Sequence, residues 1–137
     1  MSKINIFCLG GLNENGKNMY VVCVDDDILV LEAGLQYADE QTLGIDYMIP
    51  NIDYLKQNKE RIRGIFLTHG HDENMGAITD IIDYLPNIPI YASPFTYNIV
   101  KQELLEYDKS ISSLVKIEAN KPVDVGNLKV YPVSLSH

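Results

Sequence analysis

Short apolar runs separated by polar connections make up most of this chain and predict alternating strands and helices. Residues 4–9, 19–24 and 28–31 are runs of mainly Ile, Leu, Val, Phe and Cys, joined by polar connections. Apolar runs of this length favour strands, and short polar connections favour antiparallel neighbours. We therefore expect the chain to open with three antiparallel strands.

The remaining pattern alternates between strands and helices. The expected strands are residues 64–67, 88–92, 114–118 and 128–133, and the expected helices are residues 54–59, 77–82 and 95–107. Ser93 followed by Pro94 is a typical helix start. Residues 37–50 are expected to form a long irregular loop, and residues 122–126 a turn. This order predicts an α/β (α+β) fold, with a mixed, mostly antiparallel sheet and helices on one face.

Composition and charge narrow the class of protein. A chain of 137 residues with 46% hydrophobic and 22% charged residues is one domain or part of one. Its net charge of −8 argues against a surface that holds nucleic acid through phosphate contacts alone. No apolar run approaches the roughly 18 residues of a membrane helix, so no membrane partner is expected. Cys8 and Cys23 lie in strand-like runs and are interpreted as small hydrophobic residues of a chain in a reducing cytosol, which predicts a cytoplasmic protein.

The segment 68–76 carries the clearest chemistry and lies between an expected strand and an expected helix. In an extended segment, residues two apart point to the same side, so His69 and His71 can reach one metal ion. His137 also follows an expected strand and is the candidate for a third ligand. Three imidazoles with an open fourth position would activate a bound water at neutral pH.

Both polar features of this region also have structural interpretations. Asp72, Glu73 and Asn74 can cap the following helix and interact favourably with its dipole, without any metal. Glu32 follows the expected strand 28–31 and either orients a metal-binding histidine or is a surface acid. Position alone leaves these alternatives open.

Three stretches, in order along the chain, resemble the ribonuclease J family of the metallo-β-lactamase superfamily. They are residues 10–20, residues 43–50 and residues 64–71. The resemblance runs from about Ile6 to His137. It implies that residues 1–137 form the N-terminal half of a metallo-β-lactamase αββα sandwich, with the rest of that domain and an inserted β-CASP domain absent.

The resemblance also implies a metal centre. The family's second motif, His-x-His-x-Asp-His, matches His69 and His71, places its aspartate on Glu73 and places its last histidine on Asn74. In the family's scheme His69, His71 and His137 would hold one ion, and Glu73, at the catalytic position, would hold another with Asn74. The implied cofactor is zinc, as one or two ions, with manganese or magnesium as alternatives. Because an amide is a poorer zinc ligand than an imidazole, the second metal site looks degenerate.

The implied activity is that of a metal-dependent ribonuclease, both endonuclease and 5′-to-3′ exonuclease, in RNA processing and decay. RNA is the implied partner, together with a homologous ribonuclease J subunit or a second copy. Glu32 takes the place of the family's first-motif aspartate, and the departures at Glu73 and Asn74 resemble the second, less active paralogue. A weakly active or non-catalytic RNA-binding subunit is therefore an alternative. Another metallo-β-lactamase-fold hydrolase, acting on a thioester or lactam, is the third.

Overall fold

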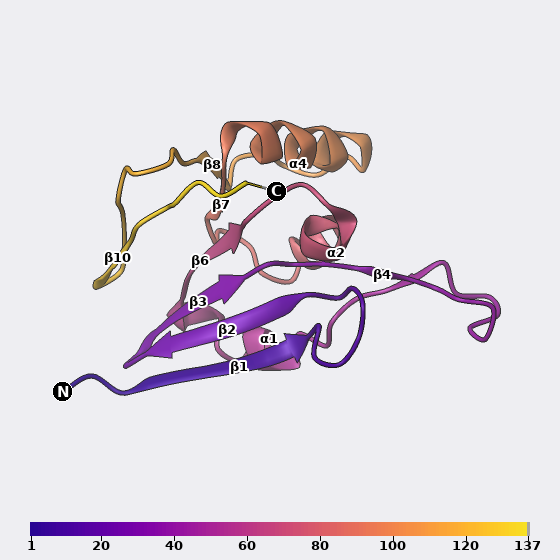
Figure 1. The fold of residues 1–137 in the computed structure, drawn as a ribbon, viewed down its shortest axis with the longest axis horizontal. Coiled ribbons are helices and arrows are strands. Elements are labelled where there is room, and N and C mark those ends of the chain that lie inside the picture. The colour runs from indigo at the N-terminus through magenta and orange to yellow at the C-terminus, as the bar shows by residue number, and fades with distance from the viewer. Residues whose placement is uncertain (137) are drawn as a thin grey trace.

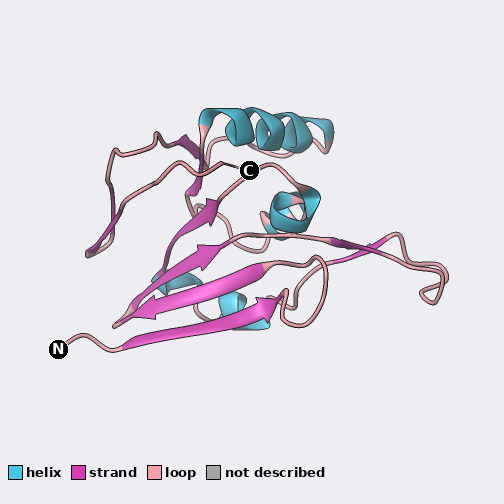
Figure 2. Cartoon of the chain, in the orientation of Figure 1, coloured by secondary structure: helices cyan, strands magenta, loops and turns pink. Residues whose placement is uncertain are grey.

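The computed structural model describes residues 1–136, and its main feature is a six-stranded sheet with short helices packed against it (Figure 1 and Figure 2). The strands are β1 (Ile4–Gly10), β2 (Met19–Val24), β3 (Asp27–Leu31), β4 (Gln36–Tyr37), β5 (Tyr47–Met48), β6 (Ile62–Leu67), β7 (Ile90–Ala92), β8 (Leu114–Lys116), β9 (Val123–Val125) and β10 (Leu128–Val130). The helices are α1 (Asp53–Gln57), a 3₁₀ helix (Lys59–Arg61), α2 (Asp72–Met75), α3 (Ile78–Ile81) and α4 (Pro94–Glu106). None of these helices is long and apolar enough to cross a membrane.

The six-stranded sheet has the order β1-β2-β3-β6-β7-β8 and is mixed. Strands β1, β2 and β3 are antiparallel, which confirms the expected start of the sheet. Strands β3, β6, β7 and β8 are parallel, because a helical connection carries the chain back between successive strands. Antiparallel pairs therefore outnumber parallel pairs only when the small sheets β4–β5 and β9–β10 are included.

Side chains along the strands alternate between two apolar clusters, one on each face of the sheet. In β3, for example, Ile28 and Val30 belong to one cluster and Leu29 to the other. The first cluster contains buried residues from every α-helix, namely Leu55 of α1, Met75 of α2, Ile78 and Ile81 of α3, and Val100 and Leu104 of α4. The expected α/β class with helices on one face is therefore confirmed.

The opposite face of the sheet is covered by the β9–β10 hairpin. Val125 of β9 packs there with Leu29, Phe66 and Tyr91, and the two aromatic rings stack with centroids 4.6 Å apart. The expected turn over residues 122–126 is therefore wrong in part, because most of this stretch pairs with β10. An apolar residue at every second position, packing on the sheet, explains why it forms a strand.

An ion pair between a buried carboxylate and a partly exposed guanidinium fixes the β9–β10 hairpin to the end of the sheet. Asp27 is 4% exposed, and its carboxylate accepts hydrogen bonds from Arg63 Nε at 2.6 Å and from the backbone N–H of Asn127 at 3.1 Å. The bond from Arg63, followed by that from Asn127, holds the pKa of Asp27 below its usual value. The contact therefore requires the ionised carboxylate.

Residues 36–48 form an arm that projects from the body of the molecule (Figure 1). The expected irregular loop is confirmed for most of this segment, with the two-residue strands β4 and β5 paired at its base. Two tyrosines attach the arm to the helices. The hydroxyl of Tyr37 donates to Asp72 at 2.5 Å, and that of Tyr47 donates to Asp80 at 2.8 Å.

The helical segment after β6 differs from expectation. The sequence predicts one helix over residues 77–82, whereas the structure has α2 inside the histidine segment and then α3. The carbonyl of Glu73 accepts a hydrogen bond from Asn18, and the N–H of Ala77 donates to Ala33, so the usual i to i−4 bond between residues 73 and 77 is absent. Contacts distant in sequence therefore divide this helix.

Candidate functional site

The candidate site lies at the edge of the sheet where β3 and β6 end. These strands are parallel neighbours, so the residues that follow them meet at the same edge. Glu32 follows β3, and its N–H donates to the carbonyl of Phe66 at 2.9 Å. Thr68 and His69 follow β6. The fold therefore brings together two segments that are more than thirty residues apart in the chain.

Glu32 is a buried acid and not a surface one. Its side chain is 5% exposed, and its backbone has a positive φ of 70°. A non-glycine residue in this region is strained by about 1 kcal/mol, so the surrounding contacts must hold it there. The carboxylate accepts the backbone N–H of Thr68 at 2.7 Å, the hydroxyl of Thr68 at 2.9 Å, and the side-chain amide of Asn74.

Thr68 connects this buried carboxylate to the first histidine. Its hydroxyl lies 2.8 Å from Nδ1 of His69. A hydroxyl has one proton, and here that proton is donated to Glu32, so the oxygen must accept from Nδ1–H of His69. This arrangement leaves the lone pair of His69 on Nε2, the nitrogen that could bind a metal.

The two histidines lie close together, as expected for residues at positions i and i+2. Their ring centroids are 4.7 Å apart and the rings are nearly perpendicular, at 82°. His71 is exposed and immediately precedes α2, with an extended backbone. Two imidazoles in this arrangement suit a zinc ion. Among residues 1–136, no group of three or more His, Cys, Asp or Glu side chains is placed to hold a metal, and His137 lies outside the described residues.

The structure places Glu73 and Asn74 differently from each other. Glu73 is exposed on the first turn of α2. Asn74 is half-buried, and its amide nitrogen donates to Glu32. The donor set therefore fits part of one metal site, at His69 and His71, but not a second site that includes the side chain of Asn74.

Backbone hydrogen bonds from two other segments hold α2 in place. The carbonyls of residues 72, 73 and 74 accept the N–H groups of Leu35, Asn18 and Ala33, at distances of 2.9, 3.1 and 2.7 Å respectively. The approach is so close that a Cβ on Gly34 would lie 1.6 Å from the carbonyl oxygen of Glu73. Any other residue at this position would force the backbone of α2 to shift.

The sequence gives no local signal for the backbone hydrogen bonds that hold α2 in place. Gly34 and the loop at residues 10–18 stand out only as flexible positions, and their partners in α2 are distant in the chain. For Thr68, the available signal is a hydroxyl residue next to the first histidine. The connection to Glu32 depends on the parallel pairing of β3 with β6, which no local pattern specifies.

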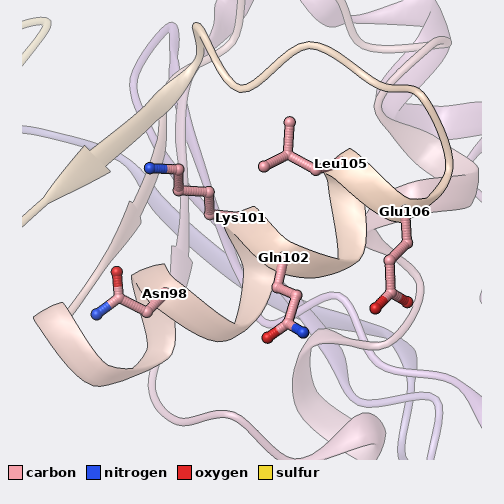
Figure 3. A pocket seen from close by; sticks show the side chains of 5 residues that line it. All are labelled: Asn98, Lys101, Gln102, Leu105 and Glu106. Atoms are coloured by element: carbon pink, nitrogen blue, oxygen red, sulfur yellow. The ribbon is translucent and has the colours of Figure 1, made fainter.

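A surface hollow of about 490 Å³ lies elsewhere, along the outer face of α4 (Figure 3). It is lined by Asn98, Lys101, Gln102, Leu105 and Glu106. All five come from one helix at helical spacing. None belongs to the histidine segment, so the hollow and the candidate site are separate.

Comparison with known proteins gives one clear result. Ribonuclease J2 of Bacillus subtilis strain 168 is 42% identical over 104 residues, which are 76% of this chain and 19% of that protein. Ribonuclease J 2 of Staphylococcus aureus strain MRSA252 is 45% identical over 101 residues, 74% of this chain and 18% of that protein. The chain therefore spans about a fifth of the length of these curated relatives. No family model matches it.

A solved structure supports the fold alone. A protein of unknown function from Enterococcus faecalis V583 superposes with a TM-score of 0.66 over 93% of this chain and 36% of that protein, at 18% identity.

The sequence similarity, which extends over about three quarters of the chain, places it within a family of curated proteins. More narrowly, the chain belongs to the ribonuclease J family, and the relatives it matches are named as ribonuclease J2.

Proposed function

We propose that this chain supplies the metal-binding edge of a ribonuclease J-type enzyme that hydrolyses RNA phosphodiesters in the cytoplasm. The observation that carries the proposal is the pair of imidazoles 4.7 Å apart, one of them oriented by Thr68 and Glu32, in a chain 42% identical to a ribonuclease J2. His69 would bind zinc through Nε2, and His71 would bind the same ion. His137 is the proposed third ligand.

The site residues would have distinct roles in this reaction. A bound zinc ion, with manganese or magnesium as alternatives, would lower the pKa of a coordinated water. Glu32 and Thr68 hold the imidazole of His69 in its metal-binding tautomer. Glu73, exposed on the first turn of α2, is the proposed proton acceptor. Because the chain carries a net charge of −8, the metal or basic residues elsewhere in the protein must offset the charge of RNA.

The test is RNA cleavage by the complete gene product. RNA labelled at its 5′ end is incubated with the protein in zinc, manganese or magnesium, and its metal content is measured by mass spectrometry. We expect cleavage that His69→Ala with His71→Ala reduces at least a hundredfold, together with a loss of bound metal. No cleavage with any of these ions, and no bound metal, would contradict the proposal.

The position of Asn74 favours a second candidate, a weakly active or non-catalytic RNA-binding subunit that works with an active homologue. Its amide nitrogen is engaged with Glu32, so one implied ligand of the second ion is missing. If this candidate is correct, Glu73→Asp with Asn74→His raises both metal content and cleavage rate. Mixing the unaltered protein with an active ribonuclease J would also yield a stable complex on size exclusion.

A further inference from the structure

We propose that Asn74 acts as a hydrogen-bond donor to Glu32 and not as a metal ligand. The Glu32–Asn74 hydrogen bond would then stabilise this part of the site without a second metal ion. In this role Asn74 is a positioning residue, acting on the histidines through Glu32 and Thr68. The proposal concerns the same site as the proposed function, and it can be tested without RNA or metal.

The chemistry of the contact fixes the orientation of the amide. A carboxylate only accepts hydrogen bonds, so the group that Asn74 turns toward Glu32 must be its NH₂. Glu32 is 5% exposed and also accepts the N–H and the hydroxyl of Thr68. Losing a donor here leaves a buried carboxylate oxygen less well satisfied, which is costly in the protein interior.

An asparagine side chain can make one of the two polar contacts that a histidine could make at this position. The amide nitrogen of asparagine is as many bonds from Cβ as Nδ1 of an imidazole, so either side chain can donate to the same carboxylate. Asparagine has no counterpart of Nε2, the nitrogen that would reach an ion. Asn74 therefore maintains the contact with Glu32 and omits the ligand.

The pair has a direct route to the histidine segment. Oε2 of Glu32 accepts both the amide of Asn74 and the hydroxyl of Thr68, and the same hydroxyl faces Nδ1 of His69. A change at Asn74 thus alters the carboxylate that orients the Thr68 hydroxyl. The tautomer of His69 should respond to residue 74 even in metal-free protein.

The test is thermal unfolding of the full chain in EDTA, comparing Asn74→Leu, Glu32→Gln and the double variant with the unaltered chain. Each single variant should lower Tm by roughly 5–10 °C, as expected for a lost hydrogen bond to a buried charge. The double variant should fall clearly less than the sum of the two. Asn98→Leu and Glu106→Gln, at exposed positions on the outer face of α4, are matched controls and should shift Tm by less than about 2 °C (Figure 3).

Two further readings complete the test. Asn74→His should keep its EDTA Tm close to that of the unaltered chain, because it retains a donor to Glu32. ¹⁵N NMR of the imidazoles should show Nδ1–H for His69 in the unaltered chain and a smaller share of that tautomer in Asn74→Leu.

The opposite results would overturn the proposal. In the first, Asn74→Leu has the same Tm as the unaltered chain in EDTA and loses only the stabilisation by zinc. In the second, the Tm changes of the two single variants add in the double variant. In the third, Asn74→His lowers Tm as much as Asn74→Leu does. The RNA cleavage test is independent of all three, so the proposed function and this inference can fail separately.

Discussion

At the scale of single residues, the candidate site combines features that the sequence predicts with contacts that it does not. The His-x-His spacing predicts that His69 and His71 lie together, and in the structure they do. Glu32 stands out as an acid at a strand end. Its partners Thr68 and Asn74 follow from the parallel pairing of β3 and β6 and from the packing of α2, which depend on the whole fold.

Thr68→Val tests the link between Glu32 and His69. The variant keeps the shape of the side chain but loses the hydroxyl that receives Nδ1–H of His69. Zinc affinity, measured by calorimetric titration, should fall about 10- to 100-fold, as for other groups that orient a metal-binding histidine. Thr68→Ser keeps a hydroxyl and should stay close to the unaltered chain. Equal affinities for the valine and serine variants would count against this role.

Asp27→Asn tests the ion pair between Asp27 and Arg63, whose contribution to stability depends on pH. The folded-state pKa of Asp27 lies below its usual value. The contribution of the ionised Asp27 carboxylate to the free energy of unfolding is therefore complete above the unfolded-state pKa of about 4, and it is lost as the pH falls through the folded-state pKa. At pH 7 the variant should lose about 1–3 kcal/mol of unfolding free energy in urea. The difference should shrink as the pH falls below about 4 and through the folded-state pKa. A difference independent of pH would argue against the ionised contact.

At the scale of elements, the site depends on how closely the segment after β3 approaches α2. The α4 helix and the first three strands follow from local pattern, and each is observed close to its expected bounds. The division between α2 and α3 does not follow from local pattern. It arises because hydrogen bonds from Asn18 and to Ala33 replace those of a continuous helix.

Gly34→Ala tests this close approach. The added Cβ would lie 1.6 Å from the carbonyl oxygen of Glu73, so α2 must move away. We expect a loss of about 3 kcal/mol or more in urea unfolding, with weaker zinc binding. Gly44→Ala is the control, because φ is +81° there but nothing lies within 4 Å of the new Cβ, so strain alone costs about 1 kcal/mol. Similar losses for both variants would contradict the steric argument.

The contacts that attach the arm raise the pKa of both its tyrosines, Tyr37 through Asp72 and Tyr47 through Asp80. The hydrogen bond to Asp80, with burial, raises the pKa of Tyr47 to about 12. Since the folded state favours the neutral phenol, this contact is intact below pH 10 and is lost as pH rises through about 12. Absorbance titration of folded protein should show late-titrating tyrosines. The amplitude near pH 12 should fall by one tyrosine in Tyr47→Phe, and one tyrosine should shift toward pH 10 in Asp80→Asn. An unchanged amplitude of late titration in Tyr47→Phe would refute the assignment to Tyr47.

At the scale of the whole molecule, the sequence predicts the fold class better than the pairing of strands. Alternating apolar positions give the strands and the helix-covered face. The share of parallel pairs and the β9–β10 hairpin depend on which strands become neighbours, and residue periodicity does not encode this. The metal site remains a prediction of the sequence and of the geometry of its two imidazoles.

The net charge of −8 predicts weak binding of RNA by this chain alone. Without metal, fluorescence anisotropy with a labelled oligoribonucleotide should give a Kd weaker than about 10⁻⁴ M, because the 19 acidic residues of the chain outnumber its 11 Lys and Arg residues. Adding zinc should tighten binding in the unaltered chain and not in a variant lacking His69 and His71. Tight metal-free binding that weakens steeply with salt would instead reveal a basic surface.

The backbone bonds that hold α2 also determine when the site can form during folding. They join segments that are distant in the chain, so the loops between them must close before the carbonyls of residues 72–74 find their partners. Contacts of this kind form slowly compared with a local helix such as α4. The imidazoles should therefore reach their final geometry late in folding, and zinc would be captured by a nearly native chain.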